Sequence, residues 1–320
     1  MQTERPGYEA CTGCSLCLLV CPVWRATGDI RLTPHGRAKA LQHGAGAEEL
    51  AASIDTCTLC GACEPACPAD IGLIAMIMEL RADLARRDPG RVAKVAGDME
   101  RRAHGAGSAG PSAACLLVPG RALPQYPEVA ACTLARLQES CRAQMSADDG
   151  ADISIALESG TPVPEARLAA FLGPLRGAKR LIVADGTLIR ALRGWLPRAH
   201  IESLGAALSS VLRDRLRAGD LYVIEPRAYH ADQDRLVKYY DAMRVSLELY
   251  MNLDLQRMAI PTTAGSWRAG AGRAVIDPRG QARWILEGSE FERVVVEDPE
   301  DVAVFGAVTE KPVLHLSQLA

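Results

Sequence analysis

Two runs of cysteines constrain this chain more than any other feature. Each run has four cysteines in the spacing C-x2-C-x2-C-x3-C, and a proline follows the last cysteine of each. This spacing is typical of [4Fe–4S] sites, where the fourth cysteine of a run commonly binds the cluster of the other run. The pattern therefore predicts two clusters: one held by Cys11, Cys14, Cys17 and Cys67, the other by Cys57, Cys60, Cys63 and Cys21.

Other uses of clustered cysteines fit the spacing less well. Zinc sites usually combine two separated C-x2-C pairs, so a triple repeat is unusual for zinc. A disulfide scaffold needs an oxidising compartment. The N-terminal segment MQTERPGYEA has no basic start followed by an apolar stretch, so we expect no secretory signal.

Bulk composition narrows the class of protein. A chain of 320 residues, 48 % hydrophobic and 23 % charged, can form two globular domains. A net charge of −3 and 4 % aromatic residues argue against a nucleic-acid partner. No stretch reaches the roughly 18 apolar residues that a membrane span needs. We expect a cytoplasmic protein, which a partner could hold at the periphery of the inner membrane.

The pattern of cysteine, apolar and small residues changes along the chain. Residues 1–88 combine the cysteine runs with helical stretches at 34–44, 48–54 and 71–87, which suggests an α-helical two-cluster ferredoxin domain. Residues 89–113 end in HGAGSAGPS and are expected to form a linker. Beyond it, short apolar runs alternate with helical stretches, which indicates a parallel α/β region. The expected strands are 114–118, 152–157, 180–185, 220–225 and 293–297, and the expected helices are 127–142, 163–176, 186–196, 203–218 and 230–250.

Two segments carry a family resemblance. TGDIRLTPHGRAKAL (27–41) and IDTCTLCGACEPACPADI (54–71) resemble the iron–sulfur subunit of glycolate oxidase. Related subunits occur in anaerobic glycerol-3-phosphate dehydrogenase, lactate utilisation systems and heterodisulfide reductase. The resemblance implies a two-cluster α-helical ferredoxin domain followed by two cysteine-rich "CCG" modules, here 114–212 and 213–320, and thus an α+α/β fold.

The region beyond the linker departs from that family pattern. The paired cysteines expected near 157–162, 229–244 and 261–267 are absent. The remaining thiols, Cys115, Cys132 and Cys141, are interpreted as buried apolar residues rather than ligands. The resemblance therefore implies degenerate CCG modules that serve as scaffold and docking surface, without clusters or thiol chemistry of their own.

The expected function is electron transfer. No flavin or nicotinamide motif and no nucleophile arrangement is visible, so we expect a non-catalytic subunit of an oxidoreductase complex. The resemblance implies that a flavoprotein partner of the glycolate or lactate dehydrogenase type supplies electrons, and that quinone or another acceptor takes them. The alternatives are a subunit of a heterodisulfide-reductase-like complex and a free two-cluster ferredoxin. His230 is interpreted as a solvated helix start, and the glycine-rich run 265–275 as a loop.

Overall fold

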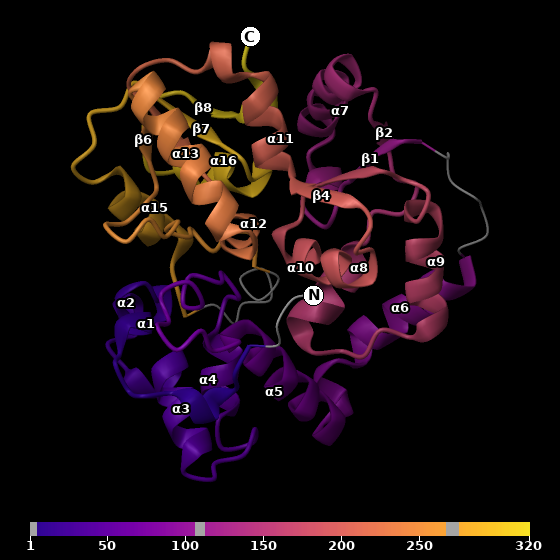
Figure 1. Ribbon diagram of the computed structural model, residues 1–320, viewed down its shortest axis with the longest axis vertical. Helices are drawn as coiled ribbons and strands as arrows, with labels where there is room; N and C mark the ends of the chain where they lie inside the picture. Colours follow the sequence, from indigo (N-terminus) through magenta and orange to yellow (C-terminus); the bar gives the residue numbers. More distant parts are fainter. Residues whose placement is uncertain (1–4, 106–112, 267–274) are drawn as a thin grey trace.

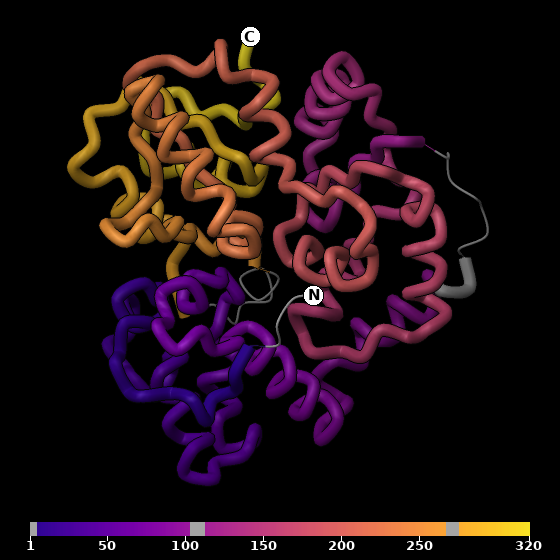
Figure 2. Tube along the Cα trace, in the orientation of Figure 1, coloured from indigo at the N-terminus to yellow at the C-terminus, as the bar shows by residue number. Residues whose placement is uncertain are grey.

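The computed structural model describes residues 5–105, 113–266 and 275–320. A helical N-terminal domain lies below two α/β units that stand side by side (Figure 1). The tube trace shows the chain crossing from the helical domain into the first unit and then into the second (Figure 2). None of the described helices is long and apolar enough to cross a membrane.

The N-terminal domain is built from helices and loops, with no strand among its described residues. A hydrophobic core that contains Ile54, Leu59, Ile77 and Leu84 packs the segment 47–59 against the segment 74–84. Its elements are η1 (Tyr8–Ala10), α1 (Leu16–Leu19), α2 (Pro22–Thr27), η2 (Ile30–Leu32), α3 (Pro34–Gln42), α4 (Ala51–Thr56), α5 (Leu73–Arg87), η3 (Pro89–Arg91) and α6 (Ala93–Gly105).

Local sequence explains where its first helices begin. Pro22 and Pro34 each occupy the first position of a helix, where the missing proline N–H costs nothing. Thr33 caps α3 by accepting the N–H of Gly36. The proline after the first cysteine run thus turns the chain directly into α2, which carries Cys21 at its N-cap.

The expected linker at 89–113 is only partly correct. Most of it, from Pro89 to Gly105, forms η3 and the helix α6, and α6 packs on α8 and α9. Val95 and Met99 are buried against Ala156, so this helix belongs to the packed structure. The stretch 106–112, which holds most of the small residues behind the prediction, lies outside the described residues.

The first α/β unit contains a four-stranded parallel sheet in the order β2-β1-β3-β4. β1 and β3 pair along four residues, from Cys115 opposite Arg180 to Val118 opposite Val183. The elements of this unit are β1 (Cys115–Val118), η4 (Leu123–Gln125), α7 (Pro127–Cys141), β2 (Gln144–Met145), α8 (Ala151–Ser159), α9 (Glu165–Leu175), β3 (Arg180–Val183), α10 (Gly186–Trp195), β4 (His200–Ser203), α11 (Leu204–Val211) and η5 (Arg213–Arg215).

The second unit repeats this topology, with strand order β6-β5-β7-β8 and parallel neighbours throughout. The two halves suggested by the sequence therefore share one strand order. The elements of this unit are β5 (Asp220–Val223), α12 (Pro226–Ala231), α13 (Gln233–Leu247), β6 (Tyr250–Met251), α15 (Pro278–Leu286), β7 (Arg293–Val296), α16 (Pro299–Gly306), β8 (Val313–His315) and η6 (Leu316–Gln318).

One hydrophobic core joins the two units. It contains Leu117 and Ile182 from the first sheet together with Tyr222 and Val295 from the second. The C-terminal turn η6 also reaches back to α7, where Arg136 donates to the carbonyl of Leu319. The α/β region is therefore one packed body that contains two sheets.

The strand expected at 152–157 is wrong, because these residues form part of α8. Ile153 and Ala156 are both fully buried, a spacing of three that suits one face of a helix. Gly150 and Gly160, both with positive φ, bound the helix. The apolar run was too short for its periodicity to separate a strand from a buried helix.

Candidate functional site

The two cysteine runs have the same backbone conformation. Positive φ angles occur at Gly13 and Ser15 in the first run and at Leu59 and Gly61 in the second. Each pair lies two and four residues after the first cysteine of its run. The left-handed conformation costs an ordinary residue roughly 1–2 kcal/mol, so a conformation repeated in both runs indicates a shared geometric requirement.

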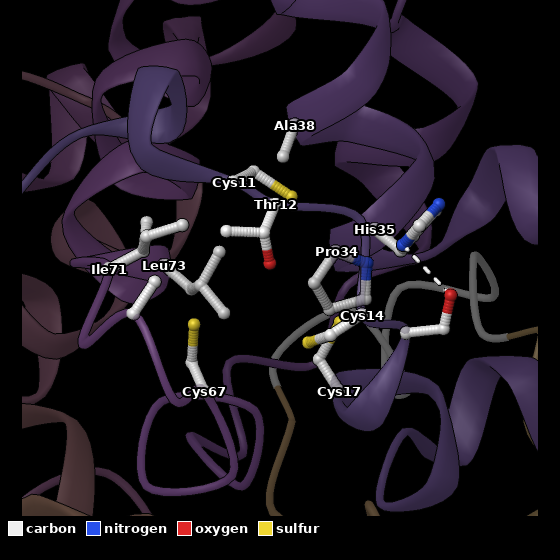
Figure 3. A pocket seen from close by; sticks show the side chains of 12 residues that line it. Cys11, Thr12, Cys14, Cys17, Pro34, His35, Ala38, Cys67, Ile71 and Leu73 are labelled. Carbon is white, nitrogen blue, oxygen red and sulfur yellow. Dashed lines mark hydrogen bonds between the residues drawn. The ribbon is translucent and has the colours of Figure 1, made fainter.

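The first site is a cavity bounded by four thiols. Cys11, Cys14 and Cys17 come from the first run and Cys67 from the end of the second. Figure 3 shows these four side chains around the cavity, with Pro34, Ile71 and Leu73 between them. The remaining lining residues are Thr12, Ser15, His35, Ala38 and Ala69. We call this cavity site 1.

The second site, here called site 2, is a cavity bounded by the other four thiols. Cys57, Cys60 and Cys63 of the second run line it together with Cys21 from the end of the first. Pro34 at the start of α3 lines both cavities, so the two sites are adjacent. The structure thus brings the eight thiols together in the two mixed groups expected from the spacing.

The thiol arrangement suits a group larger than a single ion. A tetrahedral zinc site draws four sulfurs to about 2.3 Å from one ion. Among the described residues, which include all eight of these cysteines, no three of the thiols lie within 4.8 Å of one another. The sulfurs instead bound mostly apolar cavities, and thiolates in such surroundings are the ligands of iron–sulfur clusters.

Burial keeps several of these thiols protonated while no cation is nearby. Burial, with smaller contributions from neighbouring thiols, raises the pKa of Cys17 and that of Cys60 to about 12. Burial also raises the pKa of Cys21, although the N–H groups of Trp24 and Val23 donate to its sulfur and oppose the shift. Metal binding must therefore displace these protons, and the positive charge of iron compensates the buried thiolates.

His230 reaches the second run from the α/β region. Its side chain is buried, so the expectation of a solvated helix start is wrong. Nε2 accepts the N–H of Ala259 at 3.1 Å, so the ring proton is on Nδ1, which donates to the carbonyl of Cys60 at 2.7 Å. Burial lowers the pKa of His230 to about 4, which keeps the ring neutral at pH 7.

Two arginines, of which Arg81 is buried and Arg227 partly buried, hold the same run. Arg227 of α12 donates to the carbonyl of Thr58 at 3.0 Å and pairs with Glu158 at 3.1 Å. Arg81 of α5 donates to the carbonyls of Ile54 and Cys57. Arg81 and Arg227 could not be recognised in the sequence, because nothing in their spacing marks them. The only usable signal was the Glu225-Pro226 helix start directly after a strand, which predicts α12 at the carboxyl edge of the sheet.

A polar cavity adjoins site 2, and Thr58 and Cys60 line both. Its other walls carry the carboxyl groups of Glu225, Asp298 and Asp301. Burial, followed by the charge of Asp298, raises the pKa of Glu225 to about 8. Gly265 and Ser266 also line it, but these acidic neighbours disfavour phosphate at the start of the glycine-rich run. Residues 267–274 of that run lie outside the described residues.

The three remaining cysteines line neither thiol cavity. Cys115 at the start of β1 is buried, and its sulfur lies 3.5 Å from that of Cys141 at the end of α7. Both pack in or against the core shared by the two units, as expected of apolar residues, although the contact between them was not anticipated. Cys132 is partly exposed.

Comparison with known proteins supports the assignment of the N-terminal domain. Residues 7–71 match the model of a 4Fe-4S dicluster domain. No curated protein and no solved structure matches the chain. The match and the cysteine pattern identify an iron–sulfur protein suited to electron transfer.

Proposed function

We propose that this chain is the electron-transfer subunit of an oxidoreductase complex and carries two [4Fe–4S] clusters. Cys11, Cys14, Cys17 and Cys67 would hold the cluster of site 1, and Cys57, Cys60, Cys63 and Cys21 that of site 2. The observation that carries the proposal is the grouping of these eight thiols around two adjacent apolar cavities. When bound, such clusters accept and release single electrons.

The residues around the cavities perform three tasks in this proposal. Apolar side chains such as Ile71, Leu73 and Ile74 exclude water from the thiolates. Amide N–H groups, such as those that donate to the sulfur of Cys21, stabilise negative charge. Each run supplies a ligand to the other site, so the clusters would also hold the two halves of the domain together.

The partner would meet the chain beside site 1. Cys14 is exposed, and the nearby Leu16 and Leu19 are 40 % and 58 % exposed. Exposed apolar side chains next to a redox site suit a protein interface. The resemblance at 27–41 and 54–71 favours a flavoprotein of the glycolate or lactate dehydrogenase type as the electron donor, with quinone or another acceptor downstream.

The α/β region favours a subunit of a fixed assembly over a freely diffusing ferredoxin. More than half of the chain forms this second body, and it contacts site 2 through Arg227 and His230. A shuttle protein has no need of such a body. The degenerate modules would then act as scaffold and docking surface.

Anaerobic purification of the full chain tests the proposal. We expect about eight irons and eight sulfides per chain and an EPR signal on reduction with dithionite. Purification from its native source should yield a flavoprotein in stoichiometric amount. Zinc in place of iron would refute the cluster assignment, and an iron-loaded chain without a flavoprotein would refute the partner.

A further inference from the structure

The carbonyl groups of the second cysteine run are bound more extensively than those of the first. In the first run, Lys39 and Gln42 of α3 both donate to the carbonyl of Cys11. Among the described residues, no side chain donates to the carbonyls of Thr12 or Cys14. In the second run, side chains bind all three equivalent carbonyls, those of Cys57, Thr58 and Cys60.

Two of these three donors come from one short helix of the other body. Arg227 and His230 lie on α12, which follows β5 directly. The helix is held at its start by Glu225, whose side-chain oxygens accept the N–H groups of Arg227 and Ala228. The carboxyl edge of the second sheet therefore determines where both donors lie.

The His230 ring is held from several sides, so its orientation toward Cys60 is determined by the fold. The N–H of Ala259 binds Nε2, and the ring of Tyr229 packs edge-on with centroids 5.2 Å apart. A Cβ atom placed on Gly61 would lie 3.0 Å from the Cβ of His230. The close approach of α12 to the run thus depends on a glycine at that position.

We propose that α12 is a positioning element for site 2, so that the α/β region sets the reduction potential of the cluster held there. This inference rests on the proposed function. His230 and Arg227 direct N–H groups at the run that supplies three of the four ligands. The positive ends of these dipoles stabilise the extra negative charge of a reduced cluster, which raises its potential. Site 1 has no equivalent contact from the α/β region among the described residues.

Three variants of the full chain test the proposal. His230→Leu keeps the side-chain volume and removes the donor to Cys60. His230→Asn keeps a donor close to the position of Nδ1. His315→Leu is the matched control, because His315 is also buried in the second unit and bound to the carbonyl of Glu297, away from both thiol sites.

The readout is an anaerobic redox titration followed by EPR, with iron counted in each sample. In His230→Leu we expect one of the two transitions to move to lower potential, by about tenfold in its reduction equilibrium, or 59 mV for one electron. The other transition should not move. His230→Asn should restore most of the difference, and His315→Leu should leave both transitions in place.

Several outcomes would overturn the inference. Unchanged potentials in His230→Leu would do so, as would equal shifts of both transitions or a shift also produced by His315→Leu. If His230→Leu does not fold, Arg227→Lys provides the same measurement, since lysine cannot hold Thr58 and Glu158 with one fork. A wild-type chain without clusters would instead refute the proposed function.

Discussion

Site 1 opens toward solvent at Cys14, whereas site 2 lies under α12 of the second α/β unit. The backbone of the two runs is alike, with positive φ at equivalent positions and a cavity lined by four thiols at each. The difference lies in what covers each run. The same cysteine spacing thus occurs in two environments, one exposed at Cys14 and one contacted by α12.

If each site takes its fourth thiol from the other run, the iron content of paired cysteine variants should show it. Cys14→Ala should remove about four irons, because one cluster loses a ligand. Cys14→Ala with Cys67→Ala should lose no more, since both residues serve site 1. Cys14→Ala with Cys21→Ala should lose about eight, since these residues serve different sites. Iron and sulfide counts decide between the arrangements.

If each run instead held a cluster of its own, the two double variants would exchange their results. Cys132→Ala is the matched control, because this partly exposed cysteine lines neither cavity, and it should retain full iron.

A difference in solvent access should also appear in the rates of thiol alkylation after iron is removed. Cys14 is exposed, whereas burial raises the pKa of Cys60 to about 12. At pH 8 only about one Cys60 in 10⁴ would be thiolate, which is the reactive form. We expect Cys14 to react at least a hundredfold faster than Cys60, as followed by peptide mass spectrometry.

The pH dependence of that reaction follows from the direction of the pKa shift. The rate at Cys60 should rise about tenfold per pH unit above pH 8, because the thiolate fraction rises in the same way. The folded apoprotein favours the protonated thiol of Cys60. This thiol therefore contributes its full stabilisation of the folded state below pH 9, and the contribution is lost as the pH rises toward 12. Equal rates at Cys14 and Cys60 would show that site 2 is not covered in solution.

The sequence pattern indicated which thiols line each cavity, because the fourth cysteine of such a run commonly serves the other run. The strands β1, β3, β5 and β7 were also recognisable, since each is a short, buried, β-branched or leucine-rich run between turn residues. The strands β2 and β6, of two residues each, carry too few side chains to produce a pattern.

The contacts around site 2 could not be predicted, because they join residues about 170 positions apart. His230 lies among charged residues in the sequence, which favours exposure, and only the packing of α12 on the second run buries it. Gly61 has a positive φ, a conformation that favours glycine. The structure adds a second demand on this glycine, namely the close approach of His230.

The close approach of His230 to Gly61 predicts a difference in stability between two glycine variants, and this is the smallest of the expected effects. Gly13 and Gly61 both have φ of +84°, so alanine should cost each position roughly 1–2 kcal/mol of backbone strain. At Gly13 the new methyl group would meet the Cε of Lys39 at 3.2 Å, and this flexible side chain can move. At Gly61 it would meet the Cβ of His230 at 3.0 Å, where a buried and hydrogen-bonded residue resists displacement. Overpacking of this kind typically adds about 1–3 kcal/mol.

Anaerobic denaturant titrations of the two loaded variants should therefore show a larger loss of unfolding free energy for Gly61→Ala than for Gly13→Ala. Equal losses would mean that α12 yields as easily as a lysine side chain, and the contrast between a covered and an open site would not hold.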